Sequence, residues 1–120
     1  MSEPLKQLQT AVEKLGIGHY RRHVLLCTGP SCCAPEEGNA AWEVLKKLLK
    51  DKGLLTGEKA CYRSKVGCLR VCCHGPTLVV YPEGTWYHSM TADRIPRFVE
   101  EHLENNAPVA EWIFACNKLG

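Results

Sequence analysis

The sequence lacks several features that would assign it to a common functional class. Its 120 residues carry a formal net charge of only +2 and no long basic run, so nothing in the composition supports nucleic-acid binding. No apolar stretch approaches the roughly 18 residues that a membrane-spanning helix needs. The first residues alternate charged and apolar side chains and contain no apolar secretory core. We therefore expect a cytoplasmic protein without membrane association, in which thiols stay reduced.

Cysteine is the residue type that stands out against these absences, with eight copies in the chain. Two short stretches hold most of them, Cys27, Cys32 and Cys33 in the first and Cys68, Cys72 and Cys73 in the second, while Cys61 and Cys116 lie apart. Because a helix-length segment separates the two stretches, they are interpreted as two halves of one metal site.

The apolar spacing predicts the elements around these stretches. Leucine and valine at helical intervals predict a helix over residues 3–15, which Ser2 caps and Gly16 ends. The other predicted elements are a strand at 22–27, a helix at 36–52, a weaker strand at 59–66, a hairpin at 77–81 and 85–88, and a last helix beginning near Asp93. The apolar tail 107–120 is expected to pack on the domain or on a second subunit.

This order of elements predicts an α/β fold that resembles a thioredoxin-like mixed sheet flanked by helices, with an extra N-terminal helix. At 45% hydrophobic composition the chain is large enough for one globular core. We assign residues 1–20 to an N-terminal helical extension and residues 21–120 to the thioredoxin-like domain. Both groups of cysteines then fall in loops that follow strands.

Three kinds of chemistry compete for the paired thiols. Thioredoxin-type exchange uses Cys-x-x-Cys, and no pair in the sequence has that interval. Structural zinc favours Cys-x2-4-Cys, which fits Cys68 and Cys72, whereas Cys27 and Cys32 are one residue too far apart. A [2Fe–2S] cluster gives each iron its own thiolate pair, so it suits looser loops on two separate turns.

The stretch Gly67–Pro76, followed by Thr77–Tyr87, is similar to the pattern G-C-x3-C-x2-G-P-x-V-x-V-Y-P-x-G-x-W-Y of the thioredoxin-like [2Fe–2S] ferredoxins. This family includes the Shethna type I iron–sulfur protein and is related to the small cluster subunit of NADH dehydrogenases and NAD-linked hydrogenases. The upstream run 23–27 and the segments 101–103 and 108–109 are also similar, so the resemblance covers roughly residues 22–114.

The resemblance implies a [2Fe–2S] cluster with one iron on Cys68 and Cys72 and the other on Cys27 and a cysteine of the 31–33 run. The Cys-x4-Cys spacing of the dehydrogenase subunits favours Cys32, with Cys33 as the alternative. The family also implies a homodimer that exchanges electrons with redox protein partners. On this basis the protein is expected to be a one-electron carrier and not an enzyme.

Local charge agrees with an anionic cluster, since a diferric [2Fe–2S] centre with four thiolates carries −2. The segments around the two stretches contain no acid, and their basic residues are Arg21, Arg22, Arg63, Lys65 and Arg70. Cys61 and Cys116 are interpreted as buried small apolar residues, and Cys73 as a structural residue. His23 and His74 are expected to form hydrogen bonds or carry surface charge instead of replacing thiolates as in Rieske centres.

Two other functions remain open at the level of the sequence. An iron–sulfur sensor or cluster-transfer protein would use Cys33 and Cys73 as alternative ligands. A structural zinc module is the third interpretation, and it would be colourless.

Overall fold

The computed structural model describes residues 2–71 and 73–119. The elements are α1 (Glu3–Leu15), β1 (Arg22–Cys27), α2 (Pro35–Asp51), β2 (Cys61–Val66), β3 (Leu78–Tyr81), β4 (Thr85–Tyr87), α3 (Ile95–Phe98), and β5 (Ile113–Cys116). A π-helical turn over Val99–Glu104 extends α3, and a 3₁₀ turn over Ala110–Trp112 precedes β5.

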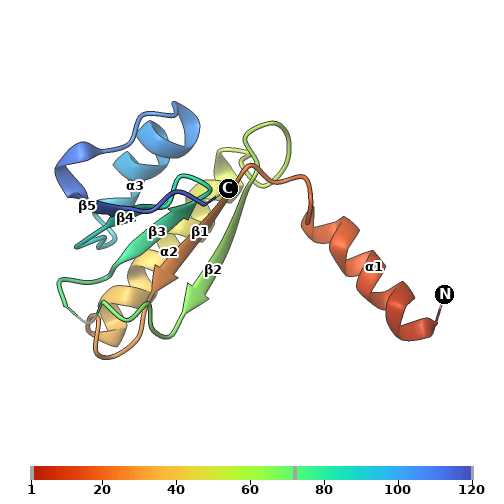
Figure 1. Cartoon of the computed structure of the whole chain (residues 1–120), viewed down its shortest axis with the longest axis horizontal. Coiled ribbons are helices and arrows are strands. Elements are labelled where there is room, and N and C mark those ends of the chain that lie inside the picture. The colour runs from red at the N-terminus through yellow and green to blue at the C-terminus, as the bar shows by residue number, and fades with distance from the viewer. Residues whose placement is uncertain (1, 72, 120) are drawn as a thin grey trace.

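The strands form one mixed sheet in the order β2-β1-β3-β4-β5 (Figure 1). β1 and β2 run parallel, joined by the crossover through α2, and the other neighbours are antiparallel. This confirms the expected thioredoxin-like α/β architecture with an extra N-terminal helix. No helix in the described parts of the chain is long and apolar enough to span a membrane.

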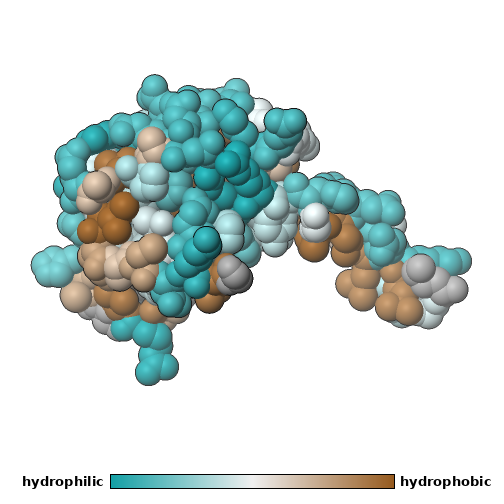
Figure 2. Space-filling view, turned by 45° about the horizontal axis from the view of Figure 1, so that its top comes forward, coloured by the Kyte–Doolittle hydropathy of each residue, from teal (hydrophilic) through white to brown (hydrophobic). Residues whose placement is uncertain are grey.

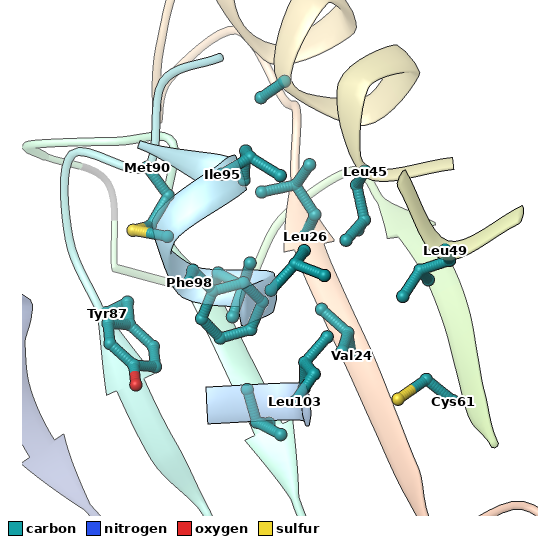
Figure 3. Packing of buried hydrophobic residues seen from close by; sticks show 14 of the residues in the cluster. Val24, Leu26, Leu45, Leu49, Cys61, Tyr87, Met90, Ile95, Phe98 and Leu103 are labelled. Atoms are coloured by element: carbon teal, nitrogen blue, oxygen red, sulfur yellow. The ribbon is translucent and has the colours of Figure 1, made fainter. Parts of the chain in front are cut away.

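The core lies between one face of the sheet and the pair α2 and α3. Alternate strand residues such as Val24 and Leu26 point at Leu45 of α2 and at Ile95 and Phe98 of α3 (Figure 3), and all of these are fully buried. Period-2 alternation in the strands and the helical spacing of apolar residues in α2 produce this single packed layer.

A buried polar network closes the edge of the core where β1 begins. Arg22 and His102 both donate to Oε2 of Glu83, at 2.8 and 2.9 Å. Nδ1 of His102 lies 2.6 Å from the hydroxyl of Tyr87, and that hydroxyl accepts a hydrogen bond from the backbone N–H of Val109 at 3.0 Å. Since the hydroxyl accepts from Val109, its own proton is available for His102. The neutral histidine then carries its proton on Nε2, facing Glu83.

The C-terminal third departs from the sequence-based expectation in three ways. The last helix begins at Ile95 instead of near Asp93, although proline still falls in its first turn, and it widens into the π-helical turn. The tail packs on the domain as expected, but it does so as a fifth strand, β5, paired with β4. Cys116 lies in this edge strand and is exposed, so its assignment as a buried structural residue was wrong.

Helix α1 projects from the body of the protein (Figure 1). Ser2 caps its first turn through a hydrogen bond to the N–H of Leu5. Its last turn ends at Gly16 in the left-handed conformation, with the N–H groups of Gly16 and Ile17 bonded to Glu13 and Val12. The expected caps are confirmed, yet the helix buries none of its residues.

Candidate metal centre

The parallel register of β1 and β2 brings the two cysteine stretches to one edge of the sheet. Cys27 ends β1 directly opposite Val66, the last residue of β2. The N–H of Thr28 donates to Val66 and that of Cys27 to Thr77, at 2.9 Å each. The first loop therefore leaves the sheet between Val66 and Thr77, the residues that flank the second loop. This is the arrangement expected if both loops serve one site.

Two glycines allow the loops to pack against each other. A Cβ on Gly29 would overlap the backbone of Gly67, and a Cβ on Gly75 would overlap both the Sγ and the carbonyl group of Cys32. Only glycine gives the backbone this close approach. The two loops are therefore interleaved, with their backbones in direct contact at Gly29 and at Gly75.

Cys32 lies at the centre of this contact and is buried. Its carbonyl accepts a hydrogen bond from the N–H of Gly75 at 3.1 Å, and its Sγ lies 3.4 Å from both the N–H and the hydroxyl of Thr77. The backbone N–H of Thr77 donates to this sulfur, whereas between the hydroxyl and the sulfur either atom can be the donor. Thr77 was not singled out from the sequence, because it resembles an ordinary first residue of the hairpin.

Cys68 begins the second loop and is exposed. Arg70 adopts a φ of 73° and directs its backbone N–H at the Sγ of Cys68, at 3.2 Å. A backbone N–H that donates to sulfur in this way stabilises negative charge on the sulfur when a cluster is bound.

Cys33, the alternative to Cys32, is half-buried beside the start of α2, where a Cβ on Gly38 would lie 3.1 Å from its Sγ. Burial, together with the neighbouring thiols of Cys32 and Cys27, raises the pKa of Cys33 to about 11. The thiols of Cys32 and Cys27 are thus near enough to Cys33 to act on it electrostatically.

Cys72, the fourth predicted ligand, lies outside the described residues. Within residues 2–71 and 73–119, no three cysteine, histidine, aspartate or glutamate side chains are grouped closely enough to hold a metal ion. Of the four predicted ligands, the structure therefore places Cys27, Cys32 and Cys68 on the two interleaved loops.

The basic residues cited from the sequence do not all lie near this edge. Arg22 begins β1, at the opposite end from Cys27, and binds Glu83. Arg63 is in the middle of β2, and the Cζ of its guanidinium lies over the ring of Trp42, 5.8 Å from the ring centroid. Only Lys65 and Arg70 belong to the end of the sheet that carries the thiols. The positive charge there is smaller than the sequence suggests.

The other singled-out residues have separate surroundings. Cys61 is buried in the core, as expected. Nε2 of His23 lies 2.8 Å from the hydroxyl of Ser64, in agreement with a hydrogen-bonding role. Cys73 and His74 instead line an open groove of about 410 Å³, together with His88 and Phe114. Cys73 is exposed there.

The fold and the thiol-bearing edge define a thioredoxin-like α/β protein with a candidate iron–sulfur site. The solved structure of a thioredoxin-like [2Fe–2S] ferredoxin from Aquifex aeolicus matches it with a TM-score of 0.73 and 24% identity, covering 83% of this chain and 96% of that one. At that identity the likeness establishes the fold alone.

Sequence relatives establish the family. A 2Fe–2S ferredoxin of Clostridium pasteurianum is 29% identical over 93 residues, which cover 74% of this chain and 91% of that relative. A candidate 2Fe–2S ferredoxin of Priestia megaterium is 31% identical over 91 residues, covering 76% and 68%. No family model matches the chain. The chain belongs to the 2Fe–2S ferredoxin family.

Proposed function

We propose that this chain carries single electrons by means of a [2Fe–2S] cluster held by Cys27, Cys32, Cys68 and Cys72. The observation that supports this most directly is the interleaving of the two thiol loops, with Gly29 against Gly67 and Gly75 against Cys32. When bound, such a cluster accepts and returns one electron without transforming a metabolite. The chain is accordingly an electron-transfer protein and not an enzyme.

The chain's own residues suit an anionic iron–sulfur centre. The N–H groups of Arg70 and Thr77 already point at the sulfurs of Cys68 and Cys32. Such N–H donors stabilise negative charge on sulfur, and the number of these hydrogen bonds is one determinant of a cluster's reduction potential. Soft thiolate donors are the ligands that iron–sulfur clusters use.

A combined assay of iron, zinc and acid-labile sulfide on freshly purified protein, together with its visible spectrum, tests the proposal. We expect two irons and two sulfides per chain and sulfur-to-iron absorption bands in the visible region. Zinc without sulfide, in a colourless protein, would show that the thiols form a structural zinc site instead.

The position of Cys33 supports one second candidate, a sensor or cluster-transfer protein. The thiols of Cys32 and Cys27 both act electrostatically on the thiol of Cys33, which could serve as a substitute ligand during cluster release. Reversible reduction and reoxidation without loss of iron supports the carrier. Ready transfer of the cluster to an apo-acceptor protein supports the alternative.

The exposed end of the sheet with Lys65 and Arg70 fits redox protein partners that present acidic rims. We further propose a homodimer located in the cytoplasm. If acidic rims guide the encounter, raising the ionic strength will slow electron transfer to the physiological partner. An unchanged rate would count against this mode of docking.

A further inference from the structure

Helix α1 carries an apolar stripe that nothing in the described chain covers. Leu5, Leu8, Val12 and Leu15 follow one another at intervals of three, four and three residues, the spacing of a helix-packing seam. Leu5, Leu8 and Leu15 are 54, 61 and 48% exposed. Figure 2 shows the apolar residues gathered on the underside of the projecting helix.

The charges of α1 avoid this stripe. At about 100° per residue, all four charged residues of the helix lie about 120° or more from the centre of the stripe. These residues are Glu3, Lys6, Glu13 and Lys14. The flanks of the stripe are Pro4, Gln9 and Ala11, which are uncharged. The helix is thus built to pack on a surface without charge.

Such a surface exists on the sheet, on the face turned away from α2 and α3. Strand alternation places Leu25, Val79 and Trp86 on that face, and the register aligns them in one row across β1, β3 and β4. None of the three belongs to the core cluster beneath the helices. Among the described elements, α2 and α3 pack together against the opposite face (Figures 1 and 3).

A second row on the same face is also uncharged at neutral pH. His23 pairs with Tyr62 on one side and Tyr81 on the other, and burial lowers the pKa of His23. Both rows are only partly covered, apart from Val79, since their other residues keep intermediate exposure. An apolar sheet face of this kind usually marks an interaction surface.

Resting on the homodimer proposed above, we propose that the two copies exchange their α1 helices, so that the stripe of each helix packs on the open sheet face of the other copy. The dimensions agree, because 13 residues of helix span about 20 Å and five strands span about 19 Å. Both the stripe and the sheet face are apolar and uncharged. In a dimer with one two-fold axis, the two stripes and the two sheet faces are all covered at once.

The area favours exchange over pairing of the two α1 helices with each other. Burial of about 100 Å² per aliphatic side chain gives roughly 400 Å² per copy for a stripe of four residues. A stable interface removes about 800 Å² per partner, which helix pairing alone does not supply. In the exchanged dimer each copy contributes its stripe and its sheet face, and the sum reaches that value.

The first test is the mass in solution of the full-length protein and of Leu8→Glu, by sedimentation equilibrium. The wild type should have twice the chain mass of 13.4 kDa. Leu8→Glu should weaken the dimer about 100-fold, because two leucine contacts are lost and two charges are placed in the interface. Thr10→Glu adds the same charge on the opposite side of the helix and should leave the dimer intact. A monomeric wild type overturns the homodimer and the exchange together, whereas a Leu8→Glu variant that dimerises normally overturns the exchange alone.

The second test identifies the surface that α1 contacts. A photoreactive benzophenone side chain at position 8 is irradiated in a mixture of ¹⁴N- and ¹⁵N-labelled protein, and the cross-linked peptides are identified by mass. Adducts between labelled and unlabelled chains on the peptides of β1, β3 or β4 support the exchange. Adducts to α1 of the other copy, or adducts within one chain only, overturn it. Neither test depends on whether a cluster is bound.

Discussion

The backbone of Gly75 lies directly against Cys32. Its N–H donates to the carbonyl of Cys32 at 3.1 Å, and a Cβ on Gly75 would overlap the Sγ of that cysteine. Together with the contact of Gly29 with Gly67, it joins the two thiol loops, although Cys32 and Gly75 lie 43 positions apart in the sequence.

Gly75→Ala is therefore expected to displace Cys32 and to reduce the amount of bound iron and sulfide at least several-fold. The measurement is iron and sulfide per chain, with far-ultraviolet circular dichroism as the measure of folding. Gly67→Ala is the matched control, because a Cβ at Gly67 would meet no atom within 4 Å. Equal cluster content in the two variants would mean that the Gly75 contact does not position the ligand.

Replacement of the predicted ligands by serine separates them from the other cysteines. Cys27→Ser, Cys68→Ser and Cys72→Ser should each lose the normal visible spectrum, because one of the two irons then lacks one of its two thiolates. Cys116→Ser should keep it, because Cys116 lies in the exposed edge strand β5. A native spectrum after Cys68→Ser would refute the ligand assignment.

Cys32→Ser and Cys33→Ser, made separately, decide the remaining ligand. The sulfur of Cys32 accepts a hydrogen bond from the backbone N–H of Thr77, so we expect the replacement of Cys32 to alter the spectrum. The replacement of Cys33 should leave the spectrum unchanged. Iron stoichiometry after repeated redox cycles is the second measurement. The reverse result would transfer the assignment to Cys33.

Tyr87→Phe should destabilise the fold by about 2–4 kcal/mol, because it leaves both His102 and the N–H of Val109 without their buried partner. Urea unfolding followed by circular dichroism gives this free energy. Tyr81→Phe, in the neighbouring strand, is half-buried and should cost much less. Similar losses in both variants would show that the network contributes little.

The same network predicts lower stability in acid. Burial lowers the pKa of His102 although the hydrogen bond that His102 donates to Glu83 acts in the opposite direction. The unfolded chain therefore takes up a proton near pH 6.5 that the folded chain resists. The free energy of unfolding should therefore fall as the pH drops below about 6.5. His102→Gln should flatten this slope, whereas His19→Gln, at an exposed position, should not. A slope that His102→Gln leaves unchanged would assign the acid sensitivity to other groups.

Burial also opposes the ionisation of Glu83, but hydrogen bonds from His102 and Arg22 outweigh it and lower the pKa of that carboxyl. The contribution of Glu83 to the free energy of unfolding is fully present above the ordinary glutamate pKa. It is lost only in stronger acid, as the pH falls through the pKa of Glu83 in the folded protein. The two groups therefore act in the same direction over successive ranges of pH.

The sequence was sufficient for α1, β1, α2 and the hairpin because each carries its own periodicity and end signals, such as Ser2 and Gly16 around α1. It also predicted that both groups of cysteines lie where strands end and loops begin, as the ends of β1 and β2 confirm. It did not predict β5, because the pairing of Ile113–Cys116 depends on β4 being available beside it. The expectation that Arg22 lies near the cluster was wrong, because Arg22 and Cys27 stand at opposite ends of β1, about 17 Å apart in extended chain.

The direction of β1 also determines where the chain can be extended. Residue 20 leads into the start of β1, and Asn117 and Leu119 bond to the hairpin turn at Gly84 and Pro82, at that same end of the sheet. Cys27 and the thiol loops occupy the other end. A fused reductase or an immobilisation tag joined at either terminus would thus be attached through the end of the sheet opposite the thiol loops. The thiol-bearing edge would then stay accessible to an electrode or to an incoming protein.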